Sequence, residues 1–120
     1  MKMNPDLIKK LLLAYEALDY PQESMDELEL PGYSPEEVRY HTELLLDGGF
    51  ILADDFAYRN TPKMFVSRRL TFEGVQFLEK AKDDNAWGET KKIMANTGGF
   101  ALDIASKVLA EVIIRSLHIT

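Results

Sequence analysis

Residues 34–52 read S-P-E-E-V-R-Y-H-T-E-L-L-L-D-G-G-F-I-L, and this stretch decides the fold that the rest of the sequence predicts. Ser34 is a favourable N-cap, and the proline after it fits the first helical position, where a backbone N–H is not needed. Val38, Thr42 and Leu45 recur at helical spacing and give the helix one inward face. Two glycines then stop the helix, and an apolar strand begins.

The sequence before this stretch predicts one helix and leaves the secondary structure of one segment undecided. Asn4 followed by proline repeats the cap signal, so a helix should run from about residue 5 to 18. Its apolar stripe consists of Ile8, Leu11, Leu12, Tyr15 and Leu18. Residues 26–30 alternate polar and apolar side chains, which is typical of a short strand, and a short helix over about residues 23–28 is the alternative.

The sequence after it predicts a hairpin and another capped helix. Residues 50–53 form a strand, the aspartates at 54–55 begin a loop, and residues 64–70 form the returning strand. A threonine then caps a helix over residues 72–82. The positions of this helix that we expect to face inward are Val75, Leu78 and Ala81.

Two further helices complete the chain. The first should run over residues 86–96, with Trp87 and Met94 on one side, and the second from about residue 100 to 117. Charges of alternating sign recur every fourth residue of the last helix and predict a solvated stripe: Asp103, Lys107, Glu111 and Arg115.

The last helix also carries a broad apolar face that needs a partner. Ile104, Val108 and Val112 should pack on the same domain or form a homodimer seam. Light scattering across concentrations would distinguish the two alternatives.

Composition limits the classes of function. The chain has 120 residues and no cysteine, which suits one domain with its own core and a reducing, cytoplasmic location. Since the sequence has no long apolar run, we expect neither a signal peptide nor a membrane span. The net charge of −6 disfavours general attraction to nucleic acid or anionic lipid.

Two motifs resemble the winged helix–turn–helix superfamily. The first is the central helix with its stop, where Val38, Leu45, Gly49, Phe50 and Ile51 match the pattern of the family's third helix and second strand. The second is R-L-T-F-E-G at residues 69–74, which resembles the segment that leads out of the wing. The resemblance implies an α+β fold: a winged-helix-like domain over residues 1–82, with a three-helix core and a β-hairpin wing, and a two-helix C-terminal extension over residues 83–120.

The sequence is also similar over its full length to a bacterial and prophage family catalogued as a domain of unknown function, family 2513. That family brings no established activity. The sequence departs from the winged-helix pattern at Thr42, where leucine is usual, and it predicts no second helix before Ser34.

Charge separates two possible binding surfaces. The outward side of the central helix would carry Glu36, Glu37, Tyr40, Glu43 and Leu44, with Arg39 as its one base. Carboxylates repel phosphates, so this side favours a protein partner over DNA. The wing offers the opposite charge through Tyr58, Arg59, Asn60, Lys63 and Arg69. Those bases could contact DNA, or they could only keep an edge strand soluble.

Chemical sites have weaker support in the sequence. His41 is expected to be a packed, hydrogen-bonded side chain, and Trp87 an anchor for the C-terminal helices. The aspartate pairs at 54–55 and 83–84 fit turns and caps better than a metal site. No phosphate-binding glycine loop or nucleophile elbow is present. We therefore expect a regulatory or protein-interaction module without enzymatic activity, cofactor or metal, which contacts a protein partner through the central helix or the last helix. A DNA-binding regulator that uses the wing is the alternative.

Overall fold

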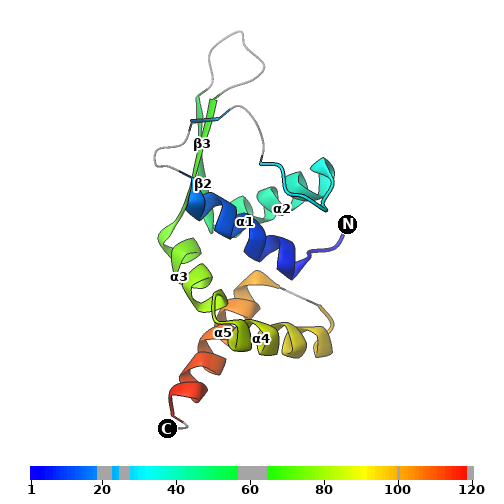
Figure 1. Ribbon diagram of the computed structural model, residues 1–120, viewed down its shortest axis with the longest axis vertical. Helices are drawn as coiled ribbons and strands as arrows, with labels where there is room; N and C mark the ends of the chain where they lie inside the picture. Colours follow the sequence, from blue (N-terminus) through cyan, green and yellow to red (C-terminus); the bar gives the residue numbers. More distant parts are fainter. Residues whose placement is uncertain (19–22, 25–27, 57–64, 100, 119–120) are drawn as a thin grey trace.

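The computed structural model describes residues 1–18, 23–24, 28–56, 65–99 and 101–118 (Figure 1). The described part is a mostly helical domain with a small antiparallel sheet. Its elements are α1 Pro5–Ala17, β1 Glu23–Ser24, α2 Pro35–Asp47, β2 Ile51–Phe56, β3 Phe65–Leu70, α3 Phe72–Ala81, α4 Asp84–Asn96 and α5 Leu102–Leu117.

Each of the first four helices starts at a residue that caps it. Ser34 and Glu37 form a capping box on α2, in which the Ser34 N–H donates to Glu37 Oε1 at 3.1 Å and the Glu37 N–H donates to Ser34 Oγ at 3.2 Å. Asn4, Thr71 and Asp83 cap α1, α3 and α4 through side-chain oxygens. The helix starts that the sequence predicts after Asn4, Ser34 and Thr71 are confirmed, whereas α4 starts at Asp84, two residues before the predicted start at residue 86.

Strands β2 and β3 pair as an antiparallel hairpin, with Ile51 opposite Leu70 and Asp54 opposite Ser67. The predicted hairpin is confirmed, but the prediction that Asp54 and Asp55 begin a loop is wrong, because β2 continues through both residues to Phe56. The backbone of β3 supplies ladder partners for them, and this pairing overrides the low strand propensity of aspartate. Residues 57–64, including the rest of the predicted loop, lie outside the described residues.

The sequence left the segment between α1 and α2 undecided, and there residues 23–24 form a strand, so the alternative short helix over about residues 23–28 is wrong at these two residues. β1 pairs with β3 through Glu23 opposite Ser67, which gives the sheet order β1-β3-β2. The strand predicted over residues 26–30 is wrong at residues 28–30, which have no regular structure, and residues 25–27 lie outside the described part. The alternation there reflects burial without a ladder, since Leu28 and Leu30 pack against the core while Glu29 is exposed.

The core is organised around α1, whose apolar stripe is completely buried at Leu7, Ile8, Leu11 and Leu12. On α3 the inward positions differ from the prediction, because Leu78 and Ala81 are buried but Val75 is 39% exposed. The buried face of α3 runs instead through Gly74, Phe77, Leu78 and Ala81, at spacings of three and four. Close packing of Gly74 on the backbone of Phe50, between α2 and β2, fixes this rotation of the helix.

The C-terminal helices share this core. Phe77 of α3 lies between Phe50 and Trp87, with ring-centroid distances of 5.1 and 6.0 Å. On α5, Leu109 and Val112 are buried in the same cluster and Val108 packs against it, while Ile104 stays 50% exposed. Val112 therefore packs within its own chain; the oligomeric state and the division at residues 82 and 83 remain predictions.

The predicted stripe of charges on α5 is exposed at all four positions. The β2–β3 hairpin and the last turns of α5 extend from opposite ends of the molecule, whose shape is elongated, 58 × 29 × 23 Å (Figure 1). Within the described residues, no helix has both the length and the apolar character needed to cross a bilayer.

Candidate functional site

The outward face of α2 is acidic, as its helical spacing predicts. Glu36 and Glu43 are exposed, and Tyr40 and Leu44 are half-buried between the acidic positions and the core. Glu37 is also half-buried, and its carboxylate is occupied by the capping box. The surface thus offers carboxylates beside an aromatic and an aliphatic side chain, which is a suitable composition for contact with a basic protein surface.

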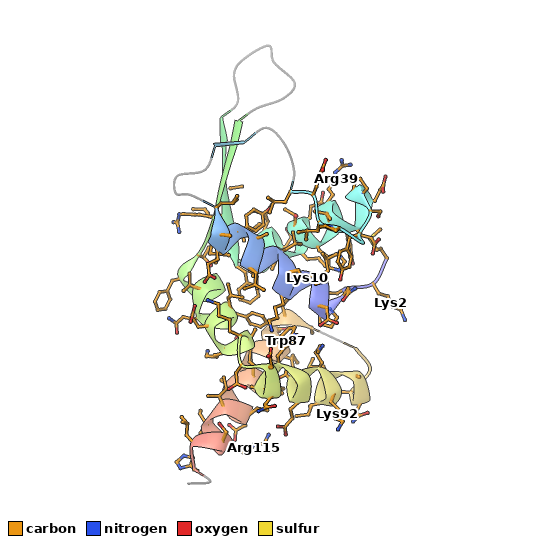
Figure 2. The ribbon with its side chains drawn as sticks, in the orientation of Figure 1. Lys2, Lys10, Arg39, Trp87, Lys92 and Arg115 are labelled. Carbon is orange, nitrogen blue, oxygen red and sulfur yellow. The ribbon has the colours of Figure 1, made fainter. Side chains whose placement is uncertain are left out.

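Arginine and aspartate complete the charge of this face. Arg39 projects from α2 away from α1 (Figure 2), and Asp47 is exposed at the last turn. Over Pro35–Asp47, four carboxylates stand against one arginine. The face is therefore negative as a whole.

The inward face of α2 is fixed to α1 by His41, which is 1% exposed. The backbone N–H of Asn4 donates to His41 Nε2 at 2.7 Å, and His41 Nδ1 lies 2.7 Å from the carbonyl oxygen of Glu37. This geometry requires a neutral ring that carries its hydrogen on Nδ1, because the other nitrogen must accept. The prediction of a packed, hydrogen-bonded histidine is confirmed, and α2 is held in one orientation on α1.

A second connection fixes α2 to the hairpin and α3. The Thr71 hydroxyl donates to the carbonyl oxygen of Gly49 at 2.5 Å and accepts from the Gly74 N–H at 3.0 Å. The Thr71 N–H donates to the carbonyl oxygen of Phe50 at 3.0 Å. A Cβ on Gly74 would lie only 2.0 Å from that same oxygen. The R-L-T-F-E-G motif therefore has a structural explanation in this chain: the threonine joins two elements, and the glycine permits their contact.

The basic wing residues are only partly within the described structure. Arg69 is exposed, and its Nη1 donates to the carbonyl oxygen of Leu70 at 3.0 Å. Tyr58, Arg59, Asn60 and Lys63 lie outside the described residues.

A groove between α1 and α4 was not predicted from the sequence. Its volume is about 540 Å³, and it is lined by α1, by α4 and by Tyr33, which lies in the loop that precedes α2. The charged residues that line it are Asp6, Lys9, Lys10, Asp84 and Lys91. The helical spacing places these residues on the surface of their own helices, but only the tertiary fold, in which α1 and α4 both pack on α3, brings them together.

Two ion pairs cross this groove. Lys91 Nζ lies 2.7 Å from Asp6 Oδ1, and Lys9 Nζ lies 3.5 Å from Asp84 Oδ1. The indole nitrogen of Trp87 donates to Asp6 Oδ1 at 3.5 Å. This bond, and an exposed fraction of only 4% for the Trp87 side chain, are consistent with the predicted anchoring role of Trp87.

The Asp6 pair should make stability depend on pH. The hydrogen bond from Lys91 holds the pKa of the Asp6 carboxyl below its usual value, so the ionised form is favoured in the folded state. The resulting stability is present above the unfolded pKa of about 3.9 and is lost as pH falls through the lower folded value. Because the Asp6 side chain is 53% exposed, we expect Asp6→Asn to lower the free energy of unfolding by roughly 0.3–0.8 kcal/mol at neutral pH.

Urea unfolding at neutral pH and at about pH 2.5 measures this effect, since the stability contributed by the ionised Asp6 carboxyl declines as pH falls below about 3.9. Asp103→Asn on α5 is the matched control, because Asp103 is exposed and forms no ion pair within the described chain. A destabilisation by Asp6→Asn that persists unchanged at low pH would show that the ion pair is not its cause.

The described residues contain no group of three or more His, Cys, Asp or Glu side chains placed to hold a metal ion. Asp83 caps α4 through the N–H of Ala86, and Asp84 faces Lys9. These two carboxylates therefore have structural roles in this fold.

Comparison with known proteins identifies relatives of unknown activity. Residues 2–101 match the model of a family described as hypothetical protein DUF2513. An uncharacterized protein of Haemophilus influenzae is 33% identical over 118 residues, which cover 98% of each chain. No solved structure matches the chain.

Proposed function

The chain belongs to the DUF2513 family, and we propose that it is a non-enzymatic regulatory or protein-interaction module of bacterial and prophage genomes. Its partner is a protein with a basic surface, and the contact is made by the outward face of α2. The observation that carries the proposal is the exposure of Glu36 and Glu43 on one helix face, beside half-buried Tyr40 and Leu44.

The way α2 is held supports this role. His41 bonds the helix to the start of α1, and Thr71 bonds the end of its glycine stop to α3. A surface that is already rigid loses little conformational entropy on binding, which favours recognition of a specific partner. The acidic side chains would steer a basic partner toward this face and exclude acidic competitors.

Capture from a lysate of the encoding bacterium tests the proposal. We expect Glu36→Gln with Glu43→Gln to weaken binding of a specific captured protein by about tenfold, because two complementary charges are lost from the contact. The matched control is Asp103→Asn with Glu111→Gln on α5, which removes the same charge from another exposed helix face. Equal loss in both double variants, or no loss in either, would reject α2 as the binding face.

The alternative function is DNA binding, and one observation favours it. A paired β2–β3 hairpin follows α2 and precedes α3, and Arg69 is exposed on it. We propose that this order is a variant of the winged helix, without the second helix that normally precedes the recognition helix. In such proteins the recognition helix enters the major groove, where the carboxylates of α2 would meet phosphates. The acidic face makes DNA the weaker of the two proposals.

A further inference from the structure

Gly88 occupies a position on α4 that packing within the chain does not explain. It lies inside a helix, is exposed and lines the groove between α1 and α4. A Cβ built at this position would meet no atom within 4 Å. Glycine weakens a helix interior relative to alanine, so the residue lowers stability without relieving any contact. A frequent reason for such a glycine is the close approach of a ligand to the backbone.

Two lysines of α1 face the same groove and rest on aromatic rings. Lys9 Nζ lies 5.9 Å from the ring centroid of Trp87, and Lys10 Nζ lies 5.2 Å from that of Tyr33. These ring contacts restrict two side chains that are otherwise flexible. Figure 2 shows Lys10 on α1 and Trp87 between α1 and α4.

The Lys10 and Lys9 ammonium groups remain open to a further anion. Lys10 forms no ion pair within the described part of the chain. The only acid paired there with Lys9 is Asp84, at 3.5 Å, and the Asp84 side chain is 95% exposed. Three lysines against two aspartates leave the groove with a net positive charge, in a chain whose total is −6. The groove is therefore a local site of positive charge that would attract an anion.

We propose that the groove between α1 and α4 binds a small ligand with an oxyanion between Lys9 and Lys10 and an apolar part over Leu13 and Gly88. The oxyanion is a phosphate or a carboxylate, since both accept hydrogen bonds from ammonium groups. The groove volume of about 540 Å³ falls within the range of small-molecule sites. The site is separate from the α2 face and does not depend on the function proposed for it.

Trp87 is the one tryptophan of the chain, so its fluorescence reports on this groove without a label. The probes are phenyl phosphate, benzoate and inorganic phosphate, each added at constant ionic strength. We expect saturable changes in emission at millimolar concentration with an aromatic probe, and weaker binding of inorganic phosphate, which has no apolar part. Whichever of phenyl phosphate and benzoate binds more tightly identifies the preferred oxyanion.

Two variants connect binding to the proposed contacts. Lys10→Gln should weaken binding of the aromatic probe about fivefold or more, because one charged contact is lost. Gly88→Ala should raise the melting temperature, because alanine strengthens the helix. It should also weaken binding of the aromatic probe about as much as Lys10→Gln does, because the added methyl group fills the space above the helix. Lys92→Gln is the control, since Lys92 is an exposed lysine of α4 outside the groove lining.

These opposite effects of Gly88→Ala separate a binding role from a structural one. A purely structural glycine would change the melting temperature and leave probe affinity unchanged, which would overturn the proposal. Absence of saturable binding by the wild type, or equal affinities of the Lys10 and Lys92 variants, would also overturn it.

Discussion

Gly74→Ala should lower the free energy of unfolding by about 3 kcal/mol, the upper part of the usual range for overpacked sites. The added Cβ would lie 2.0 Å from the carbonyl oxygen of Phe50, which is a backbone atom and cannot turn aside. Relief would require the start of α3 to move away from Gly49 and Phe50, with loss of the two hydrogen bonds that Thr71 donates to their carbonyl oxygens. Thermal unfolding followed by circular dichroism should show a melting temperature about 10 °C lower.

Gly88→Ala is the matched control for this prediction. Both glycines are helical, but the space beside Gly88 is empty within 4 Å. The free energy of unfolding of this control should rise by about 0.5–1 kcal/mol, because alanine restricts the unfolded chain and favours the helix. If Gly74→Ala were as stable as the wild type, the close contact of α3 with Phe50 would not exist in the protein.

His41→Ala should also have a large effect and lower the free energy of unfolding by about 2–4 kcal/mol. The substitution removes a fully buried ring and leaves the Asn4 N–H without its acceptor. Urea unfolding measures the total loss, and amide hydrogen exchange should show faster exchange of Asn4 in particular. His118→Ala, at an exposed position after α5, should change stability by less than about 0.5 kcal/mol. Unchanged exchange at Asn4 would contradict the proposed bond.

Local signals in the sequence predicted most of the helices. Ser34, Asn4 and Thr71 mark helix starts because a cap is a short-range hydrogen bond that sequence spacing reveals directly. The predictions failed where partners distant in sequence decide the outcome. Pairing with β3 carries β2 through Asp54, and contact with Phe50 turns Val75 outward.

The candidate sites divide in the same way. The exposure of Glu36 and Glu43 follows from helical spacing once the inward face is known, and the structure confirms it. The groove depends on how α3 brings α1 and α4 together, and the spacing of Lys9 and Lys10 carries no information about Trp87 of α4. A pair of lysines on an amphipathic helix is usually a solvated edge, so the sequence offered no reason to select them.

The claim that α2 presents its acidic face to a protein and not to a polyanion is tested most directly by fluorescence anisotropy with duplex DNA. At about 50 mM salt, where phosphate contacts are strongest, we predict no saturable binding of the full chain. Salt-sensitive binding that is lost when Arg59, Lys63 and Arg69 become alanine would contradict the account and favour a regulator that uses the hairpin.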